Sequence, residues 1–148
     1  MTVETELTRL VGEACTDFRL TAGGLLVVKL ERWTLWVESA WRLDGPSGPM
    51  VGSLDVPADA DDNAGPLMLS EVLVRFRRVV GQTVAAVRPN APVIDLTVLF
   101  SGGYALSTFS HSVDGGSWTL RCIDGQRLAM TTLTDYESAT SEDPDGQA

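Results

Sequence analysis

The chain has 148 residues, of which 44% are hydrophobic, and this length and composition are typical of one globular domain with a buried core. Its 14 glycines and 7 prolines favour turns and short strands over long helices. The longest apolar runs are far shorter than the roughly 20 residues that span a bilayer, so the composition excludes a membrane-spanning protein and predicts no membrane partner.

The formal net charge of −9 arises in two stretches of the chain. Nine of the 20 acidic residues lie where there is no basic residue: Asp55, Asp59, Asp61 and Asp62 in the first stretch, and Asp135, Glu137, Glu142, Asp143 and Asp145 in the second. The remaining 11 acids balance the 11 bases, so the folded body is predicted to be nearly neutral. We therefore predict an acidic disordered tail over residues 135–148 and no nucleic-acid partner.

The cysteines and the first residues of the chain indicate the cellular compartment of the protein. Only Cys15 and Cys122 are present, and the opening segment MTVETELTRL carries acids without an apolar signal stretch. We expect a cytoplasmic protein with free, buried thiols.

The first half of the chain reads as a short helix followed by a β-meander. Val3, Leu7 and Leu10 recur at helical spacing, and Gly12 is placed to end the helix. Apolar alternation between turn signals then predicts strands at 17–20, 25–31, 34–39 and 41–43. Together these elements form a first unit over about residues 2–44.

The second half has the same order of elements. Residues 45–65 are rich in Pro and Gly, which predicts a linker with one short strand at 50–54. Pro66 fits the first position of a helix with an apolar stripe through Val72 and Phe76, and Gly81 ends it. Strands are predicted at 83–87, 93–100, 104–110, 118–123 and 126–132. This second unit covers about residues 66–133.

The two units align with little drift, which indicates an internal duplication. The equivalent residues, with their offsets, are Gly12 and Gly81 (69), Leu30 and Phe100 (70), and Leu35 and Leu106 (71), and "WRL" at Trp41 matches "WTL" at Trp118. We therefore predict an α+β, mostly β fold. Two tandem helix-plus-meander repeats pack with pseudo-twofold symmetry into one sandwich or barrel-like domain over residues 1–134.

The second half carries motifs of a known family. A Leu-rich helix ends in glycine, an "L-x-F-x-x-G-x-x-L" pattern follows, and a "W-x-L" strand with a Gly-containing hairpin comes last; the matching residues are Gly81, Phe100, Gly103, Leu106, Trp118, Leu120 and Gly125. Val80 and Val98 depart from the pattern by apolar exchanges. On these motifs, residues 7–133 resemble an uncharacterised family of small, internally duplicated bacterial proteins, common in actinobacteria and catalogued as a domain of unknown function. Ten arginines against one lysine are typical of such GC-rich genomes.

The resemblance implies a fold and no catalytic residues. Proteins of this size and acidity are similar to immunity proteins of bacterial toxin systems, which favours a protein-binding role. His111 is the only histidine and lies beside Asp114 without a nucleophile motif, so we predict no enzyme activity. The acidic segment from Asp59 lacks the glycine and the glutamate of a calcium loop, so we predict no metal and no cofactor.

Two groups of residues are candidates for contacts with a partner. Arg75 and Arg78, with Arg77 between them, lie near the end of the second helix and could converge on an anionic group. Trp36 lies on the strand face opposite Leu35, with Arg32 and Glu38 nearby, and the repeat places Ser107 at the position that matches Trp36. We hypothesise a protein-binding module of immunity-like type. The alternatives are a small-ligand binder with a pocket between the repeats, lined by aromatics such as Tyr104 and Trp118, and a homo-oligomeric module such as a homodimer.

Overall fold

The computed structural model describes residues 7–22, 24–56, 68–90, 95–109, 118–122, 127–131 and 136–138, with side chains up to Arg121 except that of Asn90. Within these residues the chain forms one α-helix, three short 3₁₀ turns and eleven strands. The helical elements are η1 (Thr8–Leu10), η2 (Ser53–Asp55), α2 (Leu69–Arg77) and η3 (Ser101–Gly103). No helix among the described residues is long and apolar enough to cross a membrane.

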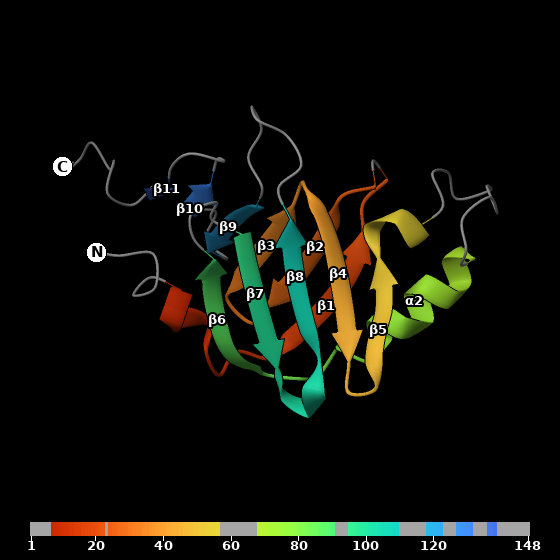
Figure 1. Ribbon diagram of the computed structural model, residues 1–148. Coiled ribbons are helices and arrows are strands. Elements are labelled where there is room, and N and C mark those ends of the chain that lie inside the picture. Colours follow the sequence, from red (N-terminus) through yellow and green to blue (C-terminus); the bar gives the residue numbers. More distant parts are fainter. Residues whose placement is uncertain are drawn as a thin grey trace.

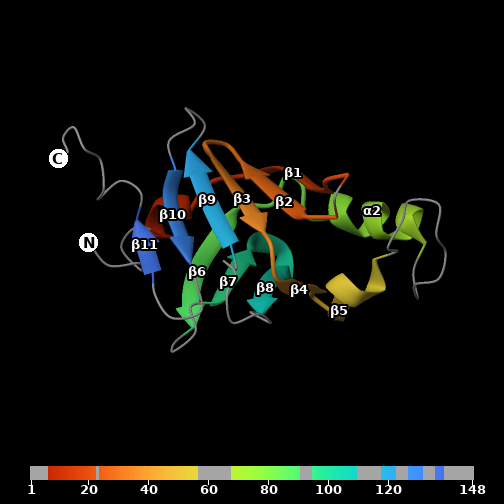
Figure 2. The same ribbon diagram turned by 90° about the horizontal axis from the view of Figure 1, so that it is seen from above.

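The strands form two antiparallel sheets, which lie in two layers (Figures 1 and 2). The first sheet has the order β1 (Cys15–Leu20), β2 (Leu26–Leu30), β3 (Trp33–Val37), β9 (Trp118–Cys122), β10 (Arg127–Thr131), β11 (Tyr136–Ser138). The second has the order β5 (Gly48–Gly52), β4 (Ala40–Gly45), β8 (Ala105–Phe109), β7 (Asp95–Phe100), β6 (Val84–Asn90). The predicted α+β, mostly β character is thereby confirmed.

Each half of the chain contributes strands to both sheets. The first three strands of the first half form one side of the first sheet, and its next two strands cross to the second sheet, where β4 pairs with β8. In the same way β6, β7 and β8 belong to the second sheet, while β9 and β10 cross back and β9 pairs with β3. Neither sheet is therefore complete without strands from both halves.

The core lies between the two sheets. Alternation puts Leu26, Val28 and Leu30 of β2 and Leu35 and Val37 of β3 on the inner face, where all five are buried. The second sheet adds the inward residues of β4, β7 and β8 to the same cluster: Trp41, Leu43, Leu96, Val98, Phe100 and Leu106. Burial of these side chains is the main force that holds the layers together.

Helix α2 lies at one side of the two layers, against β1 and β5 (Figure 1). Its apolar stripe buries Val72 and Phe76, and the Phe76 ring lies 4.8 Å from that of Phe18 and 5.8 Å from that of Trp41. Since Phe18 belongs to the first sheet and Trp41 to the second, the helix links both layers. The predicted second helix is thus confirmed over Leu69–Arg77, and Gly81 has a φ of 95° shortly after its end. Its predicted start at Pro66 is wrong, because Met68 is the extended residue that caps the helix.

The structure describes only the end of the predicted first helix. Leu7 is helical and the turn η1 follows it, with Leu7 and Leu10 buried, and Val3 lies outside the described residues. Gly12 does adopt the left-handed conformation expected after a helix, with a φ of 92°.

Residues 45–56 of the predicted linker form a hairpin and a 3₁₀ turn, and the short strand predicted at 50–54 overlaps β5. Strand β4 continues to Gly45, a tight turn follows, and β5 and η2 occupy the next residues, while residues 57–67 lie outside the described part. Gly45, Pro46, Gly48 and Pro49 form the turn and the edge of this hairpin. Similarly, Tyr136–Ser138 pair with β10, so the prediction of a disordered tail is wrong for these three residues.

The two sheets repeat the same pairings. Leu35 faces Leu120 in the first sheet and Leu106 faces Leu43 in the second, and the ladders contain irregularities at matching places, between Cys15 and Asp17 in β1 and between Val84 and Ala86 in β6. The strand segments before β1 and β6 also bind each other reciprocally. The four backbone bonds are Gly12 N–H to Val84 O, Gly81 N–H to Cys15 O and Cys15 N–H to Gln82 O, each 2.8 Å, and Val84 N–H to Glu13 O, 2.9 Å.

Candidate functional site

An apolar spot lies on the outer face of the first sheet. Neighbouring strands place Arg19, Val27, Trp36 and Thr119 in one row across β1, β2, β3 and β9. Val27 is only 1% exposed although it points away from the core, and Trp36 beside it is half-buried. The Arg121 guanidinium lies 5.2 Å from the centre of the Trp36 ring, within the range of a cation–π contact.

Charged side chains surround this spot. Lys29 on β2 and Glu38 just after β3 are exposed, and Arg19 forms a 3.0 Å ion pair with Asp17. An aromatic–arginine centre within a polar rim is the arrangement that protein–protein contact sites favour. Trp36 and Glu38 are two residues apart, so they share this face as the sequence predicts, whereas the contribution of Arg121 depends on the pairing of β3 with β9.

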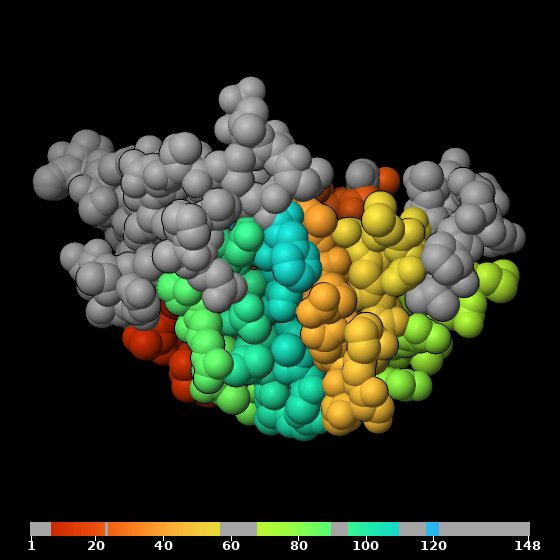
Figure 3. Space-filling view, viewed as in Figure 1, coloured from red at the N-terminus to blue at the C-terminus, as the bar shows by residue number. Residues whose placement is uncertain are grey.

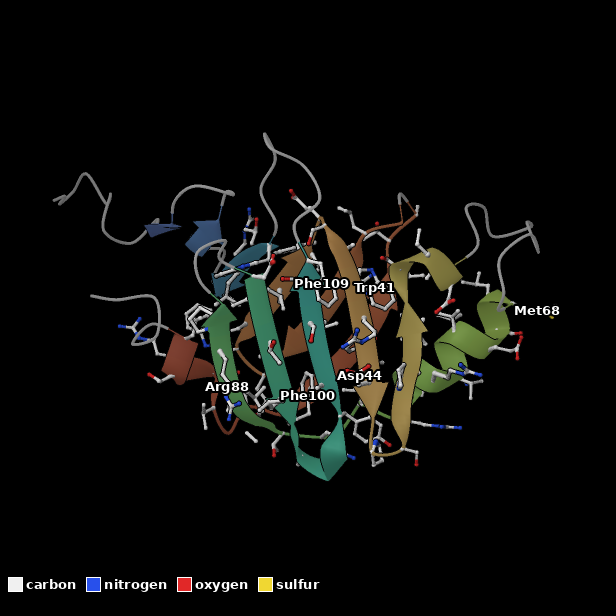
Figure 4. The ribbon with its side chains drawn as sticks, in the orientation of Figure 1. Trp41, Asp44, Met68, Arg88, Phe100 and Phe109 are labelled. Atoms are coloured by element: carbon white, nitrogen blue, oxygen red, sulfur yellow. The ribbon has the colours of Figure 1, made fainter. Side chains whose placement is uncertain are left out.

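The corresponding row of residues on the outer face of the second sheet is polar throughout. There the register aligns Arg88, Thr97, Ser107 and Arg42 across β6, β7, β8 and β4, and Figure 4 labels Arg88 on that face. Val27 and Trp36 are therefore not required by this kind of sheet. Among the described residues, the exposed aromatic on the second face is Phe109 at the end of β8, which is 42% exposed and whose ring centre lies 5.6 Å from the Arg42 guanidinium carbon (Figure 4).

Arg32, which the sequence places near Trp36, pairs with the acid Glu13. Both its backbone N–H and its Nε donate to the carboxylate of Glu13, at 2.7 and 3.1 Å. Glu13 is a buried acid, so this pair holds the turn between β2 and β3 against the segment before β1. Arg32 thus contributes to the fold and is not placed beside Trp36 by any contact among the described residues.

Arg75 and Arg78 meet in a hollow between α2 and the β4–β5 hairpin. The hollow has a volume of about 340 Å³ and is lined by the turn residues Gly45, Pro46, Ser47 and Gly48, by Pro49 and Met50 of β5, by the two arginines, and by Tyr104. Figure 3 shows the atoms of α2 beside those of this hairpin at the edge of the second sheet. A second hollow of about 300 Å³, lined by Ser70, Glu71 and Val74, shares both arginines.

The hollow joins the two halves of the chain, since its turn belongs to the first half and its arginines and Tyr104 to the second. Tyr104, one of the aromatics named for the hypothesised pocket between the repeats, lines this hollow. Trp118, expected with it, is 0% exposed and lies in the core, so that expectation is wrong. Ser47 and Met50 were not predicted as site residues, because their packing beside α2 is not visible in the local pattern of this Pro- and Gly-rich segment.

Other reactive groups offer no catalytic arrangement among the described residues. Burial raises the pKa of the Cys15 thiol to about 11, so it is a poor nucleophile at neutral pH. In the same part of the chain no group of three or more His, Cys, Asp or Glu side chains could hold a metal ion. His111, Asp114 and the acidic segment from Asp59 lie outside the described residues.

Comparison of the chain with protein families, with curated proteins and with solved structures finds no match.

Proposed function

We propose that the chain is a non-enzymatic protein-binding module that recognises its partner through the outer face of the first sheet, in the manner of an immunity protein. The observation that carries this proposal is the half-buried Trp36, under the Arg121 guanidinium and beside the buried Val27, in a row that is entirely polar on the second sheet. Tryptophan and arginine are the residue types most enriched among side chains that dominate binding energy.

The charges on this face indicate what the partner presents. Arg19 is already neutralised by Asp17, while Lys29 and Arg121 form no ion pair among the described residues. A partner with an apolar or aromatic side chain over Trp36 and acidic groups opposite Lys29 and Arg121 would complement both features.

Affinity capture with three forms of the tagged chain from a lysate of its native host tests this proposal. The wild type and Phe109→Ala should retain the same partner, and Trp36→Ala should lose it by at least tenfold, since a central anchor residue is worth about 2 kcal/mol or more. Phe109 is the matched control because it is the exposed aromatic of the other sheet, also beside an arginine. Equal recovery by all three forms would contradict the proposal, provided that circular dichroism shows them folded.

We further propose that the two halves arose by duplication of one unit and pack about a pseudo-twofold axis. Exchange of β1 to β5 with β6 to β10 maps the order of one sheet onto the other, apart from β11. The matched bulges and the reciprocal backbone bonds between the segments before β1 and β6 also support the proposal, with the single bridge between Ala14 and Thr83 nearest the axis.

A further inference from the structure

We propose that the hollow between α2 and the β4–β5 hairpin binds a small organic molecule that carries a phosphate or carboxylate group. This site lies at the edge of the second sheet and does not depend on the proposed protein-binding face.

The first argument is the state of the two arginines. The Nη1 of Arg75 donates to the carbonyl of Met50 at 2.6 Å. Met50 is the extra residue of a bulge, because Leu43 pairs with Val51 and Asp44 with Pro49, so this carbonyl is displaced from the regular ladder. The bond fixes the guanidinium and leaves its other nitrogens available, while Arg78, one turn further along, is exposed.

The second argument is the engagement of the nearby carboxylates elsewhere. Glu71 accepts the Met68 N–H at 3.0 Å, Asp44 binds the Arg42 Nε at 2.8 Å, and Asp55 accepts the Gly52 N–H at 2.7 Å. Within the described residues no carboxylate forms an ion pair with Arg75 or Arg78. Two guanidiniums at one hollow without an acidic partner favour an anionic ligand.

The third argument is the constrained shape of the wall. Gly48 has a φ of 130°, and a Cβ on Gly45 would lie 2.5 Å from the Met50 sulfur. A Cβ on Gly103, where φ is 86°, would lie 3.0 Å from the Pro46 Cβ. Gly45 and Gly103 thus allow the turn to approach Met50 and the β7–β8 connection closely, and Gly48 supplies the positive φ that the turn requires, which sets the position of the hairpin wall.

The remaining lining defines the class of ligand. Pro46, Pro49, Met50 and Tyr104 supply apolar surface, and the Ser47 hydroxyl is a further hydrogen-bond donor. A volume of about 340 Å³ is at the lower end of small-molecule sites and too small for a macromolecular surface. An anionic group on the arginines with a compact ring against Tyr104 and the prolines matches this lining.

Backbone-amide NMR titration of the full chain tests the site with phenyl phosphate and benzoate as probes and phenol as the uncharged comparison. One of the two anions should bind, with shifts centred on Ser47, Gly48 and Met50, and phenol should bind at least tenfold more weakly. Which anion binds more tightly distinguishes a phosphate from a carboxylate ligand. No shifts in this hollow with either anion at millimolar concentration would overturn the proposal.

Variants of α2 separate this site from general attraction to a basic helix. Arg78→Gln should weaken binding at least tenfold and Arg78→Lys less, because a lysine keeps the charge but loses the forked donor geometry. Arg77→Gln is the matched control, since Arg77 is also exposed but lines neither hollow, and it should retain wild-type affinity. Equal weakening by Arg77→Gln and Arg78→Gln, or tighter binding of a Glu-rich peptide than of either probe, would refute a small-molecule site.

Discussion

Cys15 shows at the scale of one residue how burial removes reactivity. Its side chain is 1% exposed at the start of β1, and desolvation raises the pKa of the thiol from its ordinary value of 9.0 to about 11. The nearby Asp17 acts on the thiolate in two ways: a hydrogen bond with its backbone lowers the pKa, while its carboxylate charge raises the pKa further. Desolvation is the larger effect, so the thiol stays protonated.

This burial predicts a loss of stability at alkaline pH. Because the pKa in the folded state is the higher one, the thiol contribution is fully present below pH 9 and is lost as the pH rises towards about 11. In a Cys122→Ser background, where Cys15 is the only thiol, the loss should reach roughly 2 kcal/mol. Urea unfolding at pH 8 and pH 11 measures this loss of unfolding free energy. The same measurement on the Cys15→Ala variant gives the part of the loss that is due to all other titrating groups. An identical alkaline loss in both forms would contradict the argument.

Gly103 allows a close approach to Pro46, and its replacement by alanine should lower the stability of the protein. Gly103→Ala meets both the strain of a positive φ, about 1–2 kcal/mol, and the Pro46 side chain, 3.0 Å from the new Cβ. Gly24→Ala is the control, since its φ of 87° is nearly the same but its Cβ would meet nothing within 4 Å. Chemical unfolding should show a larger loss for Gly103→Ala than for Gly24→Ala. Equal losses would mean that Pro46 moves away freely.

At the scale of one element, the Phe76 ring connects α2 to both sheets. Phe76 is 1% exposed and packs on Phe18 and Trp41, so Phe76→Ala should cost about 3–5 kcal/mol through lost burial and the cavity left behind. Val74→Ala, in the same helix but 49% exposed, should change stability by less than about 0.5 kcal/mol. Urea denaturation of the two variants measures both values. A small effect of Phe76→Ala would show that α2 contributes little to the core.

The elements also show what the sequence can predict. Alternation at Leu26, Val28 and Leu30 identifies β2 because a half-buried strand needs that period. The hairpin of β4 and β5 is harder to find: the sequence predicts only a short strand at 50–54, whereas β5 begins at Gly48, contains Pro49 and carries a bulge. A single sequence cannot separate a Gly-Pro turn that closes a hairpin from one that opens a linker.

The same limit applies to the candidate sites. Helical spacing brings Arg75 and Arg78 together, and alternation turns Trp36 outward, so these residues can be found from local patterns. Arg121 and Tyr104 reach their sites through strand pairing and turn packing over long sequence distances, which local patterns do not report. The sequence therefore predicts which candidate residues share a face of one helix or strand, but it does not predict which residues of other elements lie beside them.

At the scale of the whole molecule, the exchange of strands makes the two halves interdependent. The first half supplies β4 and β5 to the second sheet, and the second half supplies β9 and β10 to the first. On its own, each half would expose the apolar inner faces of its strands in both sheets. It would also leave an unpaired strand edge, at β3 in the first half and at β8 in the second. We therefore expect a stable fold only when both halves are present.

Separately expressed fragments test this dependence. A chain cut between Ala60 and Asp61, outside the described elements, gives fragments that each carry one set of strands. Alone, neither should show a cooperative thermal transition, because a half leaves its apolar face in water. Mixed from denaturant in equal amounts, they should form a 1:1 complex with a cooperative transition, detected by circular dichroism and by light scattering after size exclusion. A fragment that folds cooperatively by itself would show that its strands close a core without the other half, and the interlocked arrangement would then not be the source of stability.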